Sequence, residues 1–188
     1  RTTNRHDLSL KPPRKTMLDL LKDAGRDVIA VGKIFDIFDG EGVTEKIKTT
    51  GNTNGIAFTK ALQTRDFEGL AFVNLVDFDM LYGHRRDVAG YAAAATEFDK
   101  FVADFIPGMR EGDILMVTAD HGCDPSYTKT TDHTREYVPY LICGKGVKPG
   151  VDLGTRLCFG TIAQTICDYL GVDASTLDGQ SVLRDILK

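Results

Sequence analysis

Three of the four histidines in this chain, His84, His121 and His133, lie in short acid-rich segments where a metal ion could be bound. Imidazole nitrogens and carboxylate oxygens are the donors that divalent ions such as Mn²⁺, Zn²⁺ and Mg²⁺ select. A single Asp-His pair is more often a hydrogen-bonded loop than a pair of ligands, but the concentration of histidine in these segments favours a metal centre. The predicted ligands are Asp79, His84, Asp120, His121 and His133.

Five donor side chains are too many for one tetrahedral ion and too few for two closed structural sites, each of which needs four donors. The set therefore indicates either two open catalytic ions or further ligands from another part of the protein. Two adjacent ions are the usual means of holding a phosphoryl group between the attacking and leaving oxygens. The donor set thus favours phosphoryl-group chemistry.

The segments that must position these donors alternate between helices and short apolar strands. Helices are expected at residues 16–25, 56–62, 87–105 and 161–170, and strands at 27–32, 69–77, 113–119 and 137–143. Residues 33–54, which are rich in glycine and charge, are expected to form a loop with at most a turn of helix. The alternation predicts an α/β fold in which a mostly parallel sheet is sandwiched by helices.

The predicted ligands follow the ends of predicted strands. Asp79 comes after the run 69–77, and Asp120 with His121 comes after the run 113–119. In parallel α/β sheets ligands bind beyond the carboxyl ends of the strands, so these residues are expected at one edge. Gly122 is expected to allow the turn that brings Asp120 and His121 together, and residues 79–84 are expected to form a tight loop around Gly83.

Composition excludes several classes of protein. The chain has 188 residues, 42% of them hydrophobic and 27% charged, as in a soluble globular domain. Its net charge of −4 disfavours a nucleic-acid surface, and no apolar run is long enough for a membrane span, so a cytoplasmic location is predicted. The four cysteines include no C-x-x-C pair and are expected to be reduced and without a metal role.

The motifs closely resemble those of the phosphopentomutases, a family within the alkaline phosphatase superfamily. The resemblance lies in residues 1–7, 32–34, 39–45, 74–87, 118–122 and 131–139. It implies an alkaline-phosphatase-like core in which Asp120 and His121 hold one manganese ion. Asp79, His84 and His133 would hold the second.

The resemblance also implies that this chain is the C-terminal portion of a longer enzyme. Residues 1–15 would end a cap or hinge segment, and residues 16–188 would form an incomplete metal-binding α/β core. No catalytic nucleophile is expected within the chain, because the family's phosphorylated threonine and its remaining metal-binding aspartate lie in an N-terminal segment without a counterpart here. Most of the family's cap domain has no counterpart either.

The implied reaction is an isomerisation of ribose 1-phosphate and ribose 5-phosphate, or of the deoxyribose pair. It would pass through a phosphothreonine enzyme and a sugar bisphosphate, which is both intermediate and activator. Lys33 and Arg1 are the basic residues expected to reach the sugar phosphate, because a dianion needs a cationic partner. A solvated loop charge is an equal alternative for Lys33 and the favoured one for Arg1. Arg85 and Arg86 are expected to be surface charges, unless one of them orients a ligand carboxylate.

Three alternatives stay open at this point. Cofactor-independent phosphoglycerate mutase shares the Asp-His-Gly turn, although residues 131–136 argue for the pentose enzyme. The chain as given could be a metal-binding fragment without turnover, or a structural zinc module that unfolds on chelation. The expected partner is a small sugar phosphate rather than nucleic acid or membrane, and the sequence does not indicate an oligomeric state.

Overall fold

The computed structural model describes residues 9–188, so Arg1 and the rest of residues 1–8 lie outside the described residues. The chain divides into two compact units. The first unit comprises Arg1–Thr49, Arg65–Asn74 and Asp152–Asp185, and the second comprises Thr50–Thr64, Leu75–Val151 and Ile186–Lys188.

A three-stranded parallel sheet forms the centre of the first unit. Its strands, in the order β2-β1-β3, are β2 (Glu45–Ile47), β1 (Asp27–Val31) and β3 (Gly69–Val73). β1 pairs in parallel with both neighbours, and its residues 28–31 are at most 1% exposed. This burial explains why the strand is a continuous apolar run rather than an alternating one. The predicted strands at 27–32 and 69–77 are confirmed, with the second ending at Val73.

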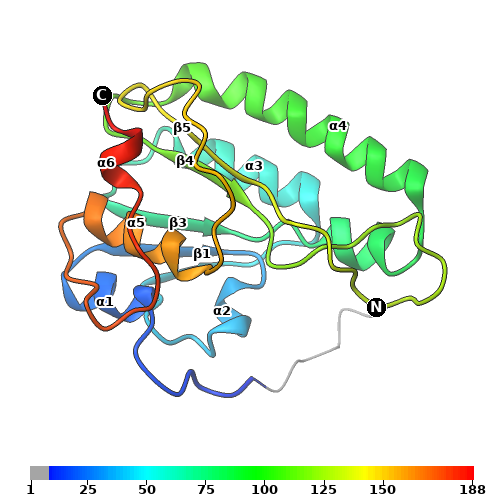
Figure 1. Ribbon diagram of the computed structural model, residues 1–188, viewed down its shortest axis with the longest axis horizontal. Helices are drawn as coiled ribbons and strands as arrows, with labels where there is room; N and C mark the ends of the chain where they lie inside the picture. The colour runs from blue at the N-terminus through cyan, green and yellow to red at the C-terminus, as the bar shows by residue number, and fades with distance from the viewer. Residues whose placement is uncertain (1–8) are drawn as a thin grey trace. The chain divides into compact units, whose positions relative to one another are not determined.

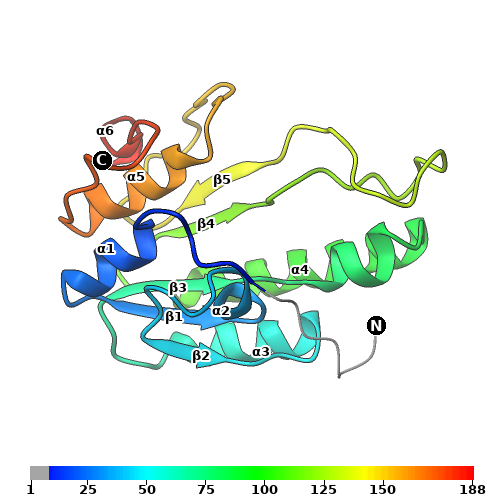
Figure 2. The same ribbon diagram turned by 90° about the horizontal axis from the view of Figure 1, so that it is seen from below.

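Helices pack against this sheet and supply the other half of the core of the first unit. They are α1 (Met17–Asp23), α2 (Ile34–Ile37) and α5 (Gly160–Tyr169). The sequence boundary between the two units falls within the short α6 (Leu183–Ile186), after Asp185. α1 contacts both β1 and α5, as Figures 1 and 2 show. The core contains Leu18, Leu21 and Val28, which have no exposed surface. The prediction of an α/β fold with a parallel sheet is therefore confirmed for this unit.

Strand β2 corrects the expectation that residues 33–54 form a loop with a turn of helix. The turn of helix exists as α2, but Glu45–Ile47 adds a third strand to the sheet. The strand has three residues, two of them charged, so neither length nor apolar periodicity reveals it. Its charges are matched locally, since Lys46 lies 2.8 Å from Asp36 and Glu45 accepts hydrogen bonds from Arg65.

The second unit holds the longest helix and a strand pair. Its elements are α3 (Asn52–Leu62), the π-helix η1 (Phe78–Gly83), α4 (Val88–Phe105), the 3₁₀-helix η2 (Ile106–Gly108), β4 (Leu115–Thr118) and β5 (Tyr140–Cys143). α3 packs beside α4, and α4 contacts η1 (Figure 1). β4 and β5 pair antiparallel, with Leu115 opposite Cys143. The strand predicted at 137–143 begins only after Pro139, as the sequence indicated.

A long connection between β4 and β5 carries three of the predicted ligands, Asp120, His121 and His133. It runs from Ala119 to Pro139 as two extended arms, which Figure 2 shows in yellow-green. The arms are joined by an isolated antiparallel bridge between Gly122 and Thr134.

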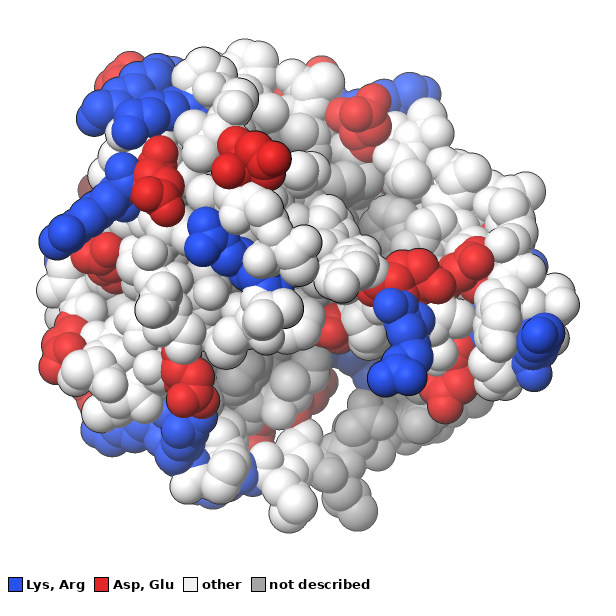
Figure 3. Space-filling view, viewed as in Figure 1, with Lys and Arg blue, Asp and Glu red and all other residues white. Residues whose placement is uncertain are grey.

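Two surface properties bear on the expected partners. Within residues 9–188, the helices are too short or too polar to cross a bilayer. On the face shown in Figure 3, acidic and basic side chains are interspersed rather than gathered by sign. This agrees with the modest net charge of −4.

Candidate metal centre

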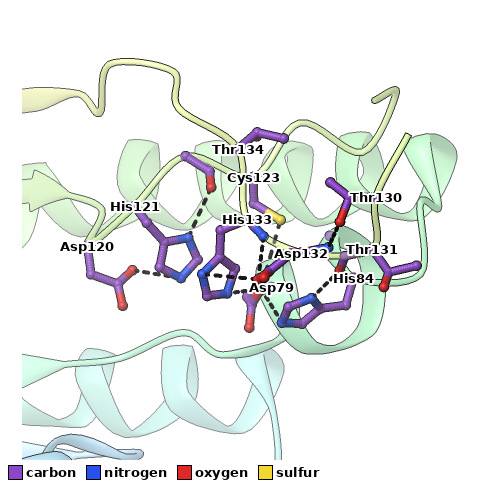
Figure 4. Close-up of polar contacts among 12 residues, drawn as sticks. Asp79, His84, Asp120, His121, Cys123, Thr130, Thr131, Asp132, His133 and Thr134 are labelled. Atoms are coloured by element: carbon purple, nitrogen blue, oxygen red, sulfur yellow. Dashed lines mark hydrogen bonds and ion pairs between the residues drawn. The ribbon is translucent and has the colours of Figure 1, made fainter. Parts of the chain in front are cut away.

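Three separate segments of the second unit bring the predicted ligands together. η1 and the residue after it provide Asp79 and His84, the arm after β4 provides His121, and the arm before β5 provides His133. Figure 4 shows these side chains pointing toward one another. The fold thus brings together residues that are up to 54 positions apart in the sequence, Asp79 and His133.

The carboxylate of Asp79 lies at the centre of the cluster. Its Oδ1 atom is 3.1 Å from Nε2 of His84 and 3.5 Å from Nε2 of His133. The ring of His133 stacks on that of His121, with centroids 3.6 Å apart and an interplanar angle of 17°. One carboxylate therefore faces three imidazoles.

The donor atoms fit a divalent ion in chemistry and in spacing. One ligand atom each from Asp79, His121 and His133 lies within 4.8 Å of the other two. Ligands that share a tetrahedral ion at about 2.0–2.2 Å are about 3.3–3.6 Å from one another. The 3.5 Å between Oδ1 of Asp79 and Nε2 of His133 already matches this separation, and the mixed nitrogen and oxygen set suits zinc or manganese.

Backbone carbonyls fix which ring nitrogen of two histidines faces the cluster. Nδ1 of His84 is 2.6 Å from the carbonyl oxygen of Thr131, and Nδ1 of His121 is 3.1 Å from that of Gly122. A carbonyl can only accept, so a neutral ring must carry its proton on Nδ1 and keep the lone pair on Nε2. This is the usual arrangement of a metal-ligating histidine. The sequence pattern could not predict that Thr131 orients the ring of His84, because Thr131 does so through its backbone carbonyl.

The π-helical geometry of η1 places Asp79 and His84 on the same side. The amide of His84 donates to the carbonyl of Asp79 at 2.9 Å, which is the i→i+5 bond that defines a π-helix. The two side chains are therefore one turn apart. The expected tight loop at 79–84 is thus wrong in form, although its consequence, two side chains directed inward, is the same. Single π-turns occur frequently at functional sites.

Two glycines act through close contact rather than through a turn. Neither Gly83 nor Gly122 is among the positive-φ residues, so the expected role in a sharp turn is wrong. A Cβ atom on Gly122 would lie 2.8 Å from the backbone nitrogen of Glu136, and one on Gly83 would lie 2.5 Å from Sγ of Cys123. The absence of side chains allows the arms to approach each other and η1.

Asp120 lies at the edge of the cluster. Its side chain is 76% exposed, and its Oδ1 atom is 3.7 Å from Nε2 of His121. Four of the five predicted ligands therefore lie together, and the fifth contacts the group through His121.

Cys123 also reaches the cluster, although no metal role was expected for it. Its Sγ atom is 3.8 Å from Oδ1 of Asp79. Burial, and secondarily the negative charge of Asp79, raises the pKa of the Cys123 thiol.

Of the two residues predicted to bind substrate, Arg1 lies outside the described residues. Lys33 belongs to the first unit, where it is half-buried two residues after the end of β1 and is the N-cap of α2. Gly32 before it has φ of 82°, and a Cβ atom there would lie 2.6 Å from the carbonyl oxygen of Asn74. Lys33 therefore occupies the carboxyl end of a central parallel strand, where ligands bind in such sheets.

Comparisons with known proteins agree with a metal site. A family model described as the metalloenzyme superfamily matches residues 1–174. The chain is 54% identical over 188 residues to phosphopentomutase of Lachnoclostridium phytofermentans and 52% identical over 187 residues to that of Acetivibrio thermocellus. In both cases the match covers 100% of this chain and 48% of the relative. The chain thus spans about half the length of these relatives.

A solved structure shares the fold. The crystal structure of Leishmania mexicana phosphoglycerate mutase at low cobalt concentration superposes with a TM-score of 0.70 at 17% identity. The match covers 91% of this chain and 39% of that one. The likeness confirms the predicted α/β fold of the alkaline phosphatase type.

Proposed function

The chain belongs to the metalloenzyme superfamily, and from this premise we propose that the intact protein is a phosphopentomutase. It would interconvert ribose 1-phosphate and ribose 5-phosphate, or the corresponding deoxyribose phosphates. The observation that carries the proposal is the convergence of Asp79, His84, His121 and His133, in a chain 52–54% identical to two phosphopentomutases. The predicted cytoplasmic location stays part of the proposal.

The ligands divide between two divalent ions in this proposal, with Mn²⁺ as the expected metal. Asp79, His84 and His133 would hold one ion, and Asp120 with His121 would hold the other. The stacking of His121 on His133 supports neighbouring sites. The exposure of Asp120 supports an open second site that takes a further ligand from outside these five residues.

Bound divalent ions would neutralise charge on a transferring phosphoryl group and activate the attacking oxygen. A threonine outside this chain would carry the phosphoryl group and pass it to a sugar hydroxyl, giving a bisphosphate. The other phosphate of that bisphosphate would then return to the threonine. Lys33 and Arg1 would pair with the phosphate dianion of the sugar.

The test is a substrate comparison with the intact gene product and Mn²⁺. We expect turnover of ribose 1-phosphate and none of 3-phosphoglycerate. Asp79→Asn should lower turnover by at least about 100-fold, because it weakens the central ligand. Asp99→Asn, the same change on the exposed surface of α4, is the matched control and should be neutral. Turnover of 3-phosphoglycerate alone would support the phosphoglycerate mutase alternative.

The chain of 188 residues is expected to behave differently when it is produced by itself. It should bind Mn²⁺ weakly and show no mutase turnover, since the proposed nucleophile lies outside it. Measurable turnover by the pure chain would contradict this. Unfolding of the chain by a chelator, followed by circular dichroism, would instead support a structural zinc module.

A further inference from the structure

Arg86 lies two residues after His84, and its burial differs from that of its neighbour Arg85. Arg85 is exposed, as expected of a surface charge, whereas Arg86 is half-buried. The expectation that both arginines are surface charges is therefore wrong for Arg86. Its backbone has φ of 55°, a left-handed conformation that a non-glycine residue keeps only where its surroundings hold it.

The guanidinium of Arg86 donates to four main-chain carbonyls. Nε donates to Thr130 at 2.8 Å, and Nη1 donates to Asp124 at 2.9 Å and to Gly83 at 3.2 Å. Nη2 donates to Thr130 and to Asp132. Because all these acceptors belong to the backbone, the contacts fix the path of the chain.

This path controls two of the ligands. Thr130 and Asp132 flank Thr131, whose carbonyl orients the ring of His84. Asp132 also directly precedes His133 in the chain. One side chain therefore ties the arm that carries His133 to the segment that carries Asp79 and His84.

An arginine is needed for this set of contacts. Its planar fork presents five N–H groups in fixed directions, while a lysine ammonium presents three from a single point. A lysine at this position could reach one or two of the four carbonyls. The substitution is therefore not conservative here.

We propose that Arg86 is a positioning residue that sets the affinity of the metal centre by holding the arm of His133 against η1. This inference rests on the metal-binding function proposed above. Arg86 itself contacts backbone oxygens rather than the reacting groups.

The loss of Arg86 should change the affinity for metal in opposite directions, depending on whether its charge or its positioning of the arm matters more. A guanidinium repels a nearby divalent cation, so removal of its charge alone would tighten metal binding. Loss of the contacts that order the arm would weaken binding instead. The direction of the change therefore separates the two effects.

The first experiment titrates metal-free intact protein with Mn²⁺ and follows the free ion by electron paramagnetic resonance. Arg86→Ala should weaken binding by about 10–100-fold, the range found when a group that orients a ligand is lost. Arg86→Lys should weaken it nearly as much, although it keeps the charge. Arg85→Ala is the matched control and should bind as the wild type does. Wild-type or tighter affinity in folded Arg86→Ala would overturn the inference.

A second measurement needs no metal. Amides of the arms are hydrogen-bonded, for example Asp124 to Oγ1 of Thr134 at 2.6 Å and Asp132 to Oγ1 of Thr130 at 3.1 Å. Their hydrogen exchange should accelerate in Arg86→Ala and in Arg86→Lys but not in Arg85→Ala. Millimolar ethylguanidinium should restore slow exchange and Mn²⁺ affinity to Arg86→Ala, while ethylammonium should not.

The two measurements separate the inference from the proposed function. Unchanged exchange in Arg86→Ala would overturn the part assigned to Arg86, whatever the protein binds. Accelerated exchange in a protein whose wild type takes up no Mn²⁺ would overturn the two-metal function and support Arg86 as the residue that orders the arm.

Discussion

The core of the first unit and the metal centre of the second are built by opposite means. Leu18, Leu21 and Val28 in the core have no exposed surface and contact other apolar groups. At the metal centre the side chains of His121 and His133 are 28% and 42% exposed, and hydrogen bonds to backbone oxygens hold the neighbouring chain. The core is held by burial of apolar area, and the centre by directional polar contacts.

The difference indicates what each region needs in order to be stable. The core is complete within its own unit, since packed apolar groups require no ligand. The centre gathers three imidazoles around one carboxylate, and in the proposed function a bound cation would be held by their inward nitrogens. Stability and metal affinity should therefore respond to different substitutions.

The largest expected effect is on the core. Leu18→Ala in the intact protein should lower the free energy of unfolding by about 2–5 kcal/mol, because it removes buried methyl groups and leaves a cavity. Leu18 has no exposed surface and packs between α1 and the sheet. Chemical denaturation measures the loss.

The same variant tests the independence of the two regions. Mn²⁺ affinity of folded Leu18→Ala should equal that of the wild type. Leu10→Ala is the control, since Leu10 is 90% exposed and its truncation should leave unfolding unchanged. A loss of metal affinity in Leu18→Ala would show that the regions are coupled and that the contrast is wrong.

The second prediction concerns the centre. Mn²⁺ at about 100 times its dissociation constant should stabilise the intact protein by about 2.7 kcal/mol, because it binds the folded state. In Asp79→Asn this gain should largely disappear at the same Mn²⁺ concentration, whereas unfolding without metal should change little. Thermal denaturation with and without Mn²⁺ measures both. Equal stabilisation of wild type and variant would place the binding site elsewhere.

The third prediction concerns a polar group inside the first unit. Thr165 has no exposed surface, and its hydroxyl donates to the carbonyl of Thr161 at 2.7 Å and accepts from the amide of Val182 at 3.1 Å. Thr165→Val keeps the shape but leaves that amide without its acceptor, which should cost about 1–3 kcal/mol of unfolding free energy. Thr165→Ser keeps the hydroxyl and should cost less in the same denaturation experiment. Unchanged stability of Thr165→Val would contradict the role assigned to the hydroxyl.

The same contrast explains what could be predicted from the sequence. β1, β3 and α1 follow from apolar runs and periodicity, because burial of apolar area decides them. The clustering of Asp79 and His121 was predicted from the ends of strands, since residue type and position suffice there.

Features decided by polar contacts were not predictable in the same way. The short charged strand β2 is fixed by its pairing with β1, and the π-helical form of η1 by one backbone bond. The half-burial of Arg86 depends on contacts with four carbonyls. One belongs to Gly83, 3 residues before Arg86, and the most distant in the chain belongs to Asp132, 46 residues after it. A sequence pattern shows only which side chains are present, so it does not predict contacts that are made to backbone oxygens.

The smallest predicted effect lies next to the centre. Asp87 is the N-cap of α4, and its carboxylate accepts a hydrogen bond from the amide of Gly90 at 2.9 Å. Asp87→Ala should lower the free energy of unfolding by about 1 kcal/mol, the typical value for loss of a cap. Asp87→Asn should lower it much less, because asparagine caps nearly as well. Thermal denaturation of the three proteins measures the difference.

Asp87 follows Arg86 directly, so its variants also show how local the polar contacts are. The guanidinium of Arg86 is held by carbonyls of the arm and of Gly83, none of which belongs to α4. Fraying of the first turn of α4 should therefore leave Mn²⁺ affinity unchanged in Asp87→Ala. A fall in affinity in Asp87→Ala but not in Asp87→Asn would show that the start of α4 helps to hold Arg86. The centre would then depend on helix stability as well as on its own backbone contacts.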